Sequence, residues 1–268
     1  MKPLARFATI ALVAIAASSP FIPPTQAFVP GVQLGDSSLQ TARRLRRYRF
    51  RVRASGYRRG GFSRSPGCPK NVDVTALTPT RDEDGTSLGN DAATYLTASE
   101  HPTFFVHLPT LPATTGKLTI QNNDPSLPLT QRQIYETDFE ITGQSGILGI
   151  RVPATAAALQ LGNTYSWQIS VICPADVTDD VTINDQTGSM AYFGGIIERV
   201  ADTPGSPTDR LDFYLNEGIW QESLLLTLEA YQNNPGDSST QTQWSTLMTD
   251  VGLEQFTTQP FLGIVNGQ

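Results

Sequence analysis

Hydrophobic and polar positions alternate with a period of two through much of residues 72–200. The clearest segment is 164–173, where Tyr165, Trp167 and Ile169 share one side and mostly polar residues occupy the other. Such alternation is typical of a strand with one buried face. Six further short segments have strand character, so we expect about seven strands: 72–77, 103–108, 117–121, 133–141, 147–152 and 191–200.

Short strands separated by turn signals predict a mainly β fold, an antiparallel β-sandwich of immunoglobulin-like architecture. The string Leu161-Gly162-Asn163-Thr164-Tyr165 resembles the entry to a late strand of such a sandwich. There a tyrosine hydrogen-bonds to backbone upstream of it. Cys173 follows this tyrosine at eight residues instead of two. The spacing between tyrosine and cysteine that antibody domains have is therefore absent. We expect this chain to share only the general sandwich architecture of the immunoglobulin fold.

The period changes to that of a helix near the end of the chain. Trp220, Leu224 and Leu228 recur at helical spacing, and a second stripe of this kind follows. We therefore expect a C-terminal layer of two to four α-helices in residues 203–268. This layer packs on the sandwich of residues 68–202, within the same globular unit. The three tryptophans are expected in the core: Trp167, Trp220 and Trp244.

Residues 1–27 have the three-part pattern of a secretory signal peptide. Lys2 and Arg6 precede an apolar run over 7–17, prolines follow, and Thr25-Gln26-Ala27 offers small residues for cleavage after Ala27. The alternative is an uncleaved anchor, but a run of eleven residues is short for a span. We expect an extracytoplasmic protein, periplasmic or secreted, with no transmembrane span after cleavage.

Residues 28–67 are rich in Arg, Gly and Ser, and we expect a disordered arm. Ten of the 19 basic residues lie between Arg43 and Arg64, with no acid among them. From Cys68 onward, 7 basic residues face 24 acidic ones, a net charge of −17. The arm is either a solvated linker or a contact element for a polyanion. The candidate contact residues are Arg43, Arg44, Arg46, Arg47, Arg49, Arg51, Arg53, Arg58 and Arg59.

The partners considered for this arm are an anionic envelope surface, an acidic glycan, an envelope protein and the acidic body itself. Arginine alternates with Tyr48, Phe50 and Val52, which gives an extended arm an apolar face. The headgroup region of a membrane accepts such an apolar face. We therefore favour a target outside the protein over docking on its own acidic body. Nucleic acid is not expected as a partner of an exported chain.

Cys68 and Cys173 are the only cysteines of the chain. In an exported protein the economical interpretation is a disulfide between them. The closed loop would contribute about 4–5 kcal/mol in the chain-entropy model. The alternative is two separate thiols. No CxxC spacing supports a redox pair.

Candidate catalytic and metal-binding residues are sparse, and we expect no catalytic site, cofactor or metal. His101 and His107 are too far apart along one strand to share an ion. We expect Glu100 and His101 to form hydrogen bonds at a strand entrance. Glu198 and Arg199 end a strand, where a partly buried ion pair is favoured over a ligand anchor. The acid-rich loop 176–185 suits calcium in ligand type, but it lacks the EF-hand spacing.

Several strings together resemble a family known only as domain of unknown function 928, found mainly in cyanobacteria. The resemblance spans roughly residues 66–262 and implies no established activity. The strings that carry it are GCP at Gly67, SEHPTFFVHLP at Ser99, LGNTYSWQISVICP at Leu161, GGIIERV at Gly194, EGIWQESL at Glu217 and VGL at Val251.

These observations predict an exported, non-enzymatic binding or interaction module of the cell envelope, with an unidentified ligand. The alternative is an envelope hydrolase that acts on glycan or peptide through paired carboxylates. That chemistry requires two carboxylates about 5–10 Å apart in one cleft. Sequence position does not reveal which acids meet in this way.

Overall fold

The computed structural model describes residues 48, 50, 53–61, 73–81, 87–88, 91–112, 114–172, 190–203 and 210–267. All of them belong to one unit, Arg46–Gln268. The signal-peptide segment 1–27, both cysteines and the acid-rich loop 176–185 lie outside these ranges.

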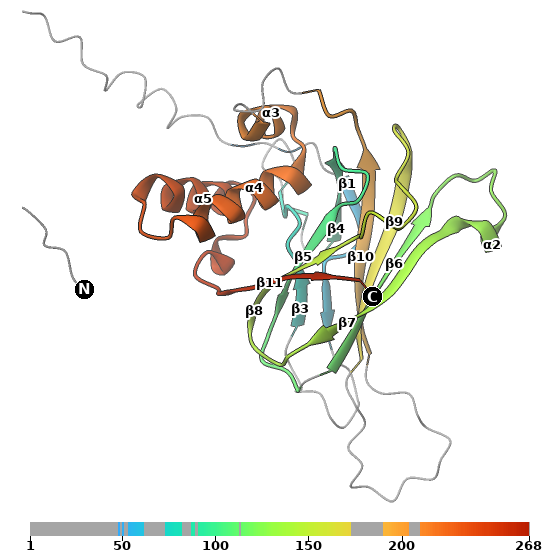
Figure 1. Ribbon diagram of the computed structural model, residues 1–268, viewed down its shortest axis with the longest axis horizontal. Helices are drawn as coiled ribbons and strands as arrows, with labels where there is room; N and C mark the ends of the chain where they lie inside the picture. Colours follow the sequence, from blue (N-terminus) through green and yellow to red (C-terminus); the bar gives the residue numbers. More distant parts are fainter. Residues whose placement is uncertain are drawn as a thin grey trace, which may run out of the picture. The chain divides into compact units, whose positions relative to one another are not determined.

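A six-stranded sheet contains most of the longer strands (Figure 1). Its neighbours are antiparallel except for β4 and β10, which run parallel. Strand β1 also pairs with β10, through Tyr57 and Gly194. In order across the sheet, the strands are β1 (Arg53–Tyr57), β4 (Asp91–Thr97), β10 (Met190–Arg199), β9 (Thr164–Ile172), β6 (Thr114–Asn122) and β7 (Gln133–Ile141).

A five-stranded sheet holds the remaining strands, and its edge strand β11 runs parallel to β8. In order, they are β11 (Phe261–Asn266), β8 (Gly146–Arg151), β5 (Thr103–Leu108), β3 (Asp73–Ala76) and β2 (Arg59–Gly61). Trp167 of β9 and Phe104 of β5 meet with ring centroids 5.1 Å apart. Side chains from both sheets therefore share one core.

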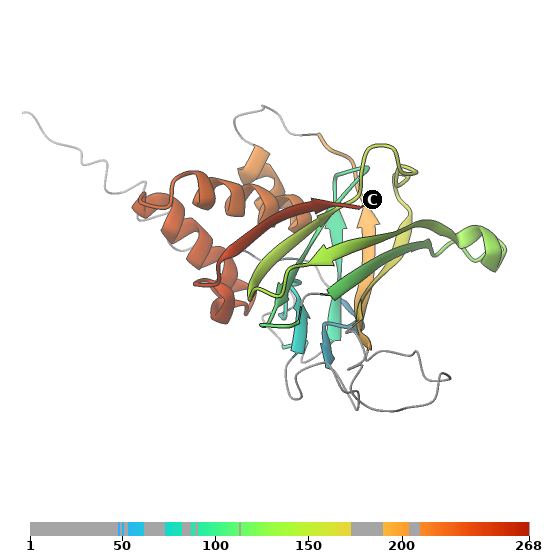
Figure 2. The ribbon, with the colours of Figure 1, turned by 60° about the horizontal axis from the view of Figure 1, so that its bottom comes forward.

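The main helices follow β10 in the chain, as expected. They are α3 (Arg210–Glu217), α4 (Trp220–Asn233), α5 (Ser238–Asp250) and the 3-10 turn η2 (Glu254–Phe256). Helix α4 packs against β4 and β5. Figure 2 shows the helices on one side of the strands and the β6–β7 hairpin, tipped by the short helix α2 (Leu129–Arg132), reaching away on the other. Among the helices described, none is long and apolar enough to cross a membrane.

All seven expected strands are present. The number of strands and the direction of some of their neighbours differ from the expected sandwich. The described ranges hold eleven strands, and the two parallel pairs differ from a purely antiparallel sandwich. Strand β4 has the sequence DAATYLT, whose small residues give a weak apolar alternation. Strand β11 returns to the sheet after the helices, a long-range pairing that leaves no periodic signal.

The expected hydrogen bond between Tyr165 and the backbone upstream of it is confirmed. The backbone N–H of Gln160 donates to Tyr165 Oη at 2.8 Å. Gly162, between the two, has a φ of 75°, the left-handed conformation that glycine adopts readily. This contact ties the turn before β9 to the first residues of the strand.

The expectation of a disordered arm over residues 28–67 is wrong for residues 53–61, which contain β1 and β2. Phe50 is also buried, with its ring 5.0 Å from the ring of Trp220 in α4. Gly60 approaches the backbone of Tyr192, where any Cβ would lie 2.7 Å from the carbonyl oxygen. The basic and glycine-rich composition of this segment suggested solvation and concealed the two short strands.

Candidate functional site

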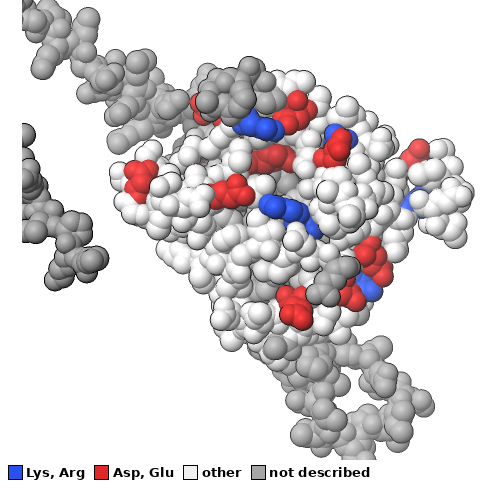
Figure 3. Space-filling view, viewed as in Figure 1, with Lys and Arg blue, Asp and Glu red and all other residues white. Residues whose placement is uncertain are grey.

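A cavity of about 400 Å³ lies where α3 and α4 meet the ends of β4, β5 and β8. Cavities of this size are typical of small-molecule sites. Ala98, Leu225 and Leu226 give it apolar walls, and the other lining residues are polar or charged. Figure 3 shows acidic and basic side chains close together near the centre of the face viewed there.

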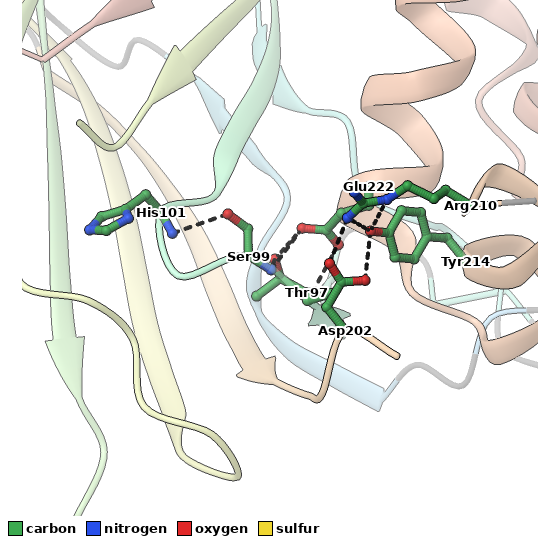
Figure 4. A network of polar contacts seen from close by, with 8 residues as sticks. Thr97, Ser99, His101, Asp202, Arg210, Tyr214 and Glu222 are labelled. Atoms are coloured by element: carbon green, nitrogen blue, oxygen red, sulfur yellow. Dashed lines mark hydrogen bonds and ion pairs between the residues drawn. The ribbon is translucent and has the colours of Figure 1, made fainter. Parts of the chain in front are cut away.

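Glu222 enters this cavity from the first turn of α4 and covers the end of β4 (Figure 4). Its Oε1 accepts from the Thr97 hydroxyl at 2.6 Å and from the Ser99 N–H at 3.1 Å. Its Oε2 accepts from the Ala98 N–H at 3.0 Å. Burial raises the pKa of Glu222, and these hydrogen bonds oppose that rise. The carboxyl group thus links helix to strand.

A second polar group in the cavity joins the segment after β10 to α3 (Figure 4). Arg210 Nη2 lies 2.6 Å from Asp202 Oδ2, and Tyr214 Oη donates to Asp202 Oδ1 at 2.9 Å. Arg210 also donates to Tyr214 Oη, through Nε at 3.2 Å and Nη2 at 2.8 Å. Burial raises the pKa of Tyr214, so the phenol stays protonated. The negative charge of Asp202 is therefore balanced by Arg210.

Two polar groups of the cavity retain free hydrogen-bonding atoms. Arg151, the last residue of β8, donates through Nε to Thr103 Oγ1 at 3.2 Å, and its two terminal nitrogens form no hydrogen bond or ion pair with the described residues. Gln221 is 3% exposed and donates through Nε2 to the Thr103 carbonyl. Its Oε1 has no partner in the described part of the chain. The cavity thus offers a cation and an amide oxygen to a ligand.

Ser99, Glu100 and His101 do not form a nucleophile–base arrangement. The Ser99 hydroxyl oxygen accepts from the backbone N–H of His101 at 3.1 Å, and His101 Nε2 lies 3.1 Å from the Ala156 carbonyl oxygen. Glu100 pairs with Arg199 at 3.0 Å. The hydrogen bonds expected for Glu100 and His101 are confirmed, and Arg199 forms a partly buried ion pair whose partner is Glu100.

The remaining predicted residues are distributed as follows. His107 lies against the ring of Phe256, at 4.8 Å between centroids. In the described ranges no group of three or more His, Cys, Asp or Glu side chains could hold a metal ion. The three tryptophans are buried, as expected: Trp167, Trp220 and Trp244.

The candidate polyanion contacts divide into three sets. Arg43, Arg44, Arg46, Arg47, Arg49 and Arg51 lie outside the described residues, as do Cys68 and Cys173 with their expected disulfide. Arg53 lies on β1 and Arg59 is exposed on β2. Arg58 is only 3% exposed, and burial, aided by the charge of Arg59, lowers its pKa to about 10. A buried guanidinium cannot meet an external polyanion, so Arg58 leaves this set.

Sequence reasoning did not single out Arg151, Gln221 or Glu222. Two signals pointed toward them. Arg151 is one of few basic residues in an acidic body and directly ends an apolar strand. Gln221 and Glu222 lie in the string EGIWQESL, which carried the family resemblance, and Ser99 opens another such string. The structure brings these two strings together at one cavity.

A comparison with family models finds one match, described as Domain of Unknown Function (DUF928), over residues 56–261. Neither a curated protein nor a solved structure matches the chain.

Proposed function

The chain belongs to the family described as Domain of Unknown Function (DUF928) and, because that description assigns no activity, we propose a function from the geometry of the cavity. The protein is a non-enzymatic binding module, and its cavity takes a small organic anion. The observation that carries this proposal is the guanidinium of Arg151, which has no acidic partner among the described residues and lines the cavity beside Gln221.

The chemistry of the ligand follows from the atoms that remain free. A guanidinium presents parallel N–H donors that match a carboxylate. The amide oxygen of Gln221 accepts a hydrogen bond from a hydroxyl or amine on the same ligand. The acids of the cavity compete little for Arg151, since Asp202 has Arg210 and Glu222 has three donors of its own. A hydroxy or amino carboxylic acid fits this set.

An envelope hydrolase is the second candidate, and one observation favours it. Asp202 and Glu222 line the same cavity, as a paired-carboxylate mechanism requires. Both carboxyl groups are already bound by protein donors, however. A general acid must direct a proton at its substrate. The hydrogen bonds of these two acids favour a structural role, so binding is the stronger proposal.

The location of the module is part of the proposal. The signal-peptide pattern of residues 1–27 supports export to the cell envelope. Arg43, Arg44, Arg46 and Arg47 supply positive charge without an intervening acid, which supports contact with an anionic envelope surface.

Calorimetric titration of the mature protein with succinate, lactate and inorganic phosphate tests the cavity. We expect saturable binding of at least one carboxylate and a loss of about tenfold or more in Arg151→Met, since a charged hydrogen bond contributes roughly 1.5–3 kcal/mol. Arg132→Met is the matched control, because Arg132 lies on α2 and bonds only to backbone carbonyls. Equal affinity in the wild type and Arg151→Met would refute the assignment, as would no binding at all.

A further inference from the structure

Two exposed tyrosines flank a trough of about 310 Å³ on the six-stranded sheet. Tyr57 is 71% exposed and Tyr192 is 53% exposed. Within the described ranges only two other large hydrophobic side chains are as open to solvent, Leu129 and Leu161. Half of this small group therefore lines a single depression. None of its lining residues belongs to the cavity that holds Arg151.

The trough lies on the face of the sheet that points away from the core. Along β10, Phe193 and Ile197 are buried, whereas Tyr192 is exposed and Gly194 is half-buried. Along β9, Trp167 is buried and Gln168 is exposed. Because side chains of a strand alternate between faces, Tyr192, Gly194 and Gln168 share the outer face.

Strand register explains why this face is hollow. Gly194 is paired with Tyr57 of β1 on one side and with Gln168 of β9 on the other. Neighbouring strands lie about 4.8 Å apart, so the backbones of Tyr57 and Gln168 are separated by about 10 Å. The middle position of this row carries no side chain. The result is a slot wide enough for one sugar ring, with a tyrosine at one end of the row.

The glycine in the floor is required by the packing of the strands. A Cβ at position 194 would collide with the carbonyl oxygen of Trp167 and approach the Cα of Gln168. The close approach of β9 to β10 thus keeps the floor of the slot bare.

The lining of the trough determines what it can bind. Among the described residues, none of the side chains that line the trough carries a charge. The amide of Gln168 and the hydroxyls of Tyr57 and Tyr192 form no hydrogen bond with the described residues, and the Ser166 hydroxyl donates to Asn123 Oδ1 at 2.6 Å. An ion finds no counter-charge here, and a purely apolar ligand leaves the Gln168 amide unpaired. Aromatic rings beside neutral hydrogen-bonding groups suit a ligand with an apolar ring face and hydroxyl groups.

We propose that this trough binds a neutral oligosaccharide, with a pyranose ring over Gly194. Tyr192 and Tyr57 contact the apolar faces of the sugar, and the amide of Gln168 bonds to its hydroxyls. The site is independent of the anion-binding cavity, so either proposal stands if the other fails.

Titration of the mature protein with hexasaccharides, followed by NMR chemical-shift changes, tests this site. The probes are β-1,4-linked glucose, α-1,4-linked glucose, β-1,4-linked xylose and β-1,4-linked N-acetylglucosamine. We expect saturable binding of at least one at millimolar concentration. Tyr192→Ala should weaken it about tenfold, the ratio that roughly 1.4 kcal/mol produces. Gln168→Ala should weaken it as well.

Leu161→Ala is the control, since Leu161 is an exposed hydrophobic residue outside the trough. Its affinity for the sugar should equal that of the wild type. Unfolding curves that coincide for all variants exclude a folding defect, which is expected because every substituted side chain is exposed. The proposal is overturned if no probe binds, or if Tyr192→Ala and the wild type bind equally well.

Discussion

Among single residues, Glu222 combines burial with an unusual density of hydrogen bonds. Burial disfavours the charged carboxylate, and the donors from Thr97, Ala98 and Ser99 favour it. Burial prevails, so the pKa of Glu222 lies above its value in the unfolded chain. Below the unfolded pKa the carboxyl is neutral in both states and costs nothing. As the pH rises from the unfolded pKa toward the folded pKa, the carboxyl ionises in the unfolded chain but stays protonated in the fold. The free energy of unfolding therefore falls progressively.

Glu222→Gln should remove this pH dependence, because glutamine does not ionise. The variant loses hydrogen bonds at every pH, but the stability of the wild type relative to it should fall as the pH rises from about 4, near the ordinary pKa of glutamate, toward the raised pKa of the folded state. Urea unfolding of both proteins across this range measures the difference. Glu229→Gln is the control, because Glu229 is exposed on the same helix. If the curves for the wild type and Glu222→Gln stay parallel with pH, the burial argument is wrong.

At the scale of elements, helix α4 joins the helical layer to the strands through its first turn. Trp220 Nε1 donates to the Leu77 carbonyl at 3.0 Å. Its ring meets that of Phe50 edge to face, at 85° between planes. Glu222, two residues later, reaches β4. The first turn of α4 therefore anchors the helix with one aromatic and one polar contact.

Trp220→Ala should destabilise the fold by about 3–5 kcal/mol, the usual cost of truncating a buried aromatic side chain. The substitution also leaves the Leu77 carbonyl without its donor. Urea denaturation measures the change, with Leu129→Ala on the exposed tip of α2 as the control, which should stay within about 0.5 kcal/mol of the wild type. An unchanged midpoint for Trp220→Ala would show that α4 is held by other contacts.

At the scale of the whole molecule, the basic N-terminal segment is joined to the acidic body. Phe50 is buried, the Tyr48 N–H donates to Asp250 Oδ2 at 2.8 Å, and residues 53–61 supply strands to both sheets. Docking on the body, one of the alternatives considered from the sequence, therefore holds for residues 48, 50 and 53–61. An external contact is left as a proposal for Arg43–Arg47.

Truncation separates these two parts of the segment. A mature protein without residues 28–47 should melt at the temperature of the complete mature protein. Loss of residues 28–52 also removes Phe50, which should cost about 3 kcal/mol or more and lower the melting temperature by several degrees. The shorter truncation should abolish sedimentation with anionic vesicles at about 0.1 M salt, where charges are weakly screened.

Vesicles of neutral lipid serve as the control for this sedimentation, and the complete protein should not sediment with them. Equal sedimentation of the complete and 28–47-truncated proteins with anionic vesicles would remove the arm from the proposed function. Equal melting temperatures for the two truncated proteins would contradict the anchoring role of Phe50.

Local patterns predicted the elements that bury one face. Tyr165 and Trp167 in β9, and Leu224 and Leu228 in α4, are buried at the spacing that the sequence showed. Helices α3 and α5 each end close to a glycine with positive φ, Gly218 and Gly252, a conformation that glycine adopts readily. Strands β1, β2, β4 and β11 were missed because their composition is small, basic or short in apolar alternation.

The sequence by itself determined seven of the eleven strands, the C-terminal helical layer and the burial of the three tryptophans, because burial of one face leaves a period that local reading detects. Only the tertiary structure decided that Arg151 and Gln221, 70 positions apart, line one cavity, and that Tyr57, Gly194 and Gln168 form one row. Strand order and register place such residues together, and pairing between distant segments imposes no period on either of them.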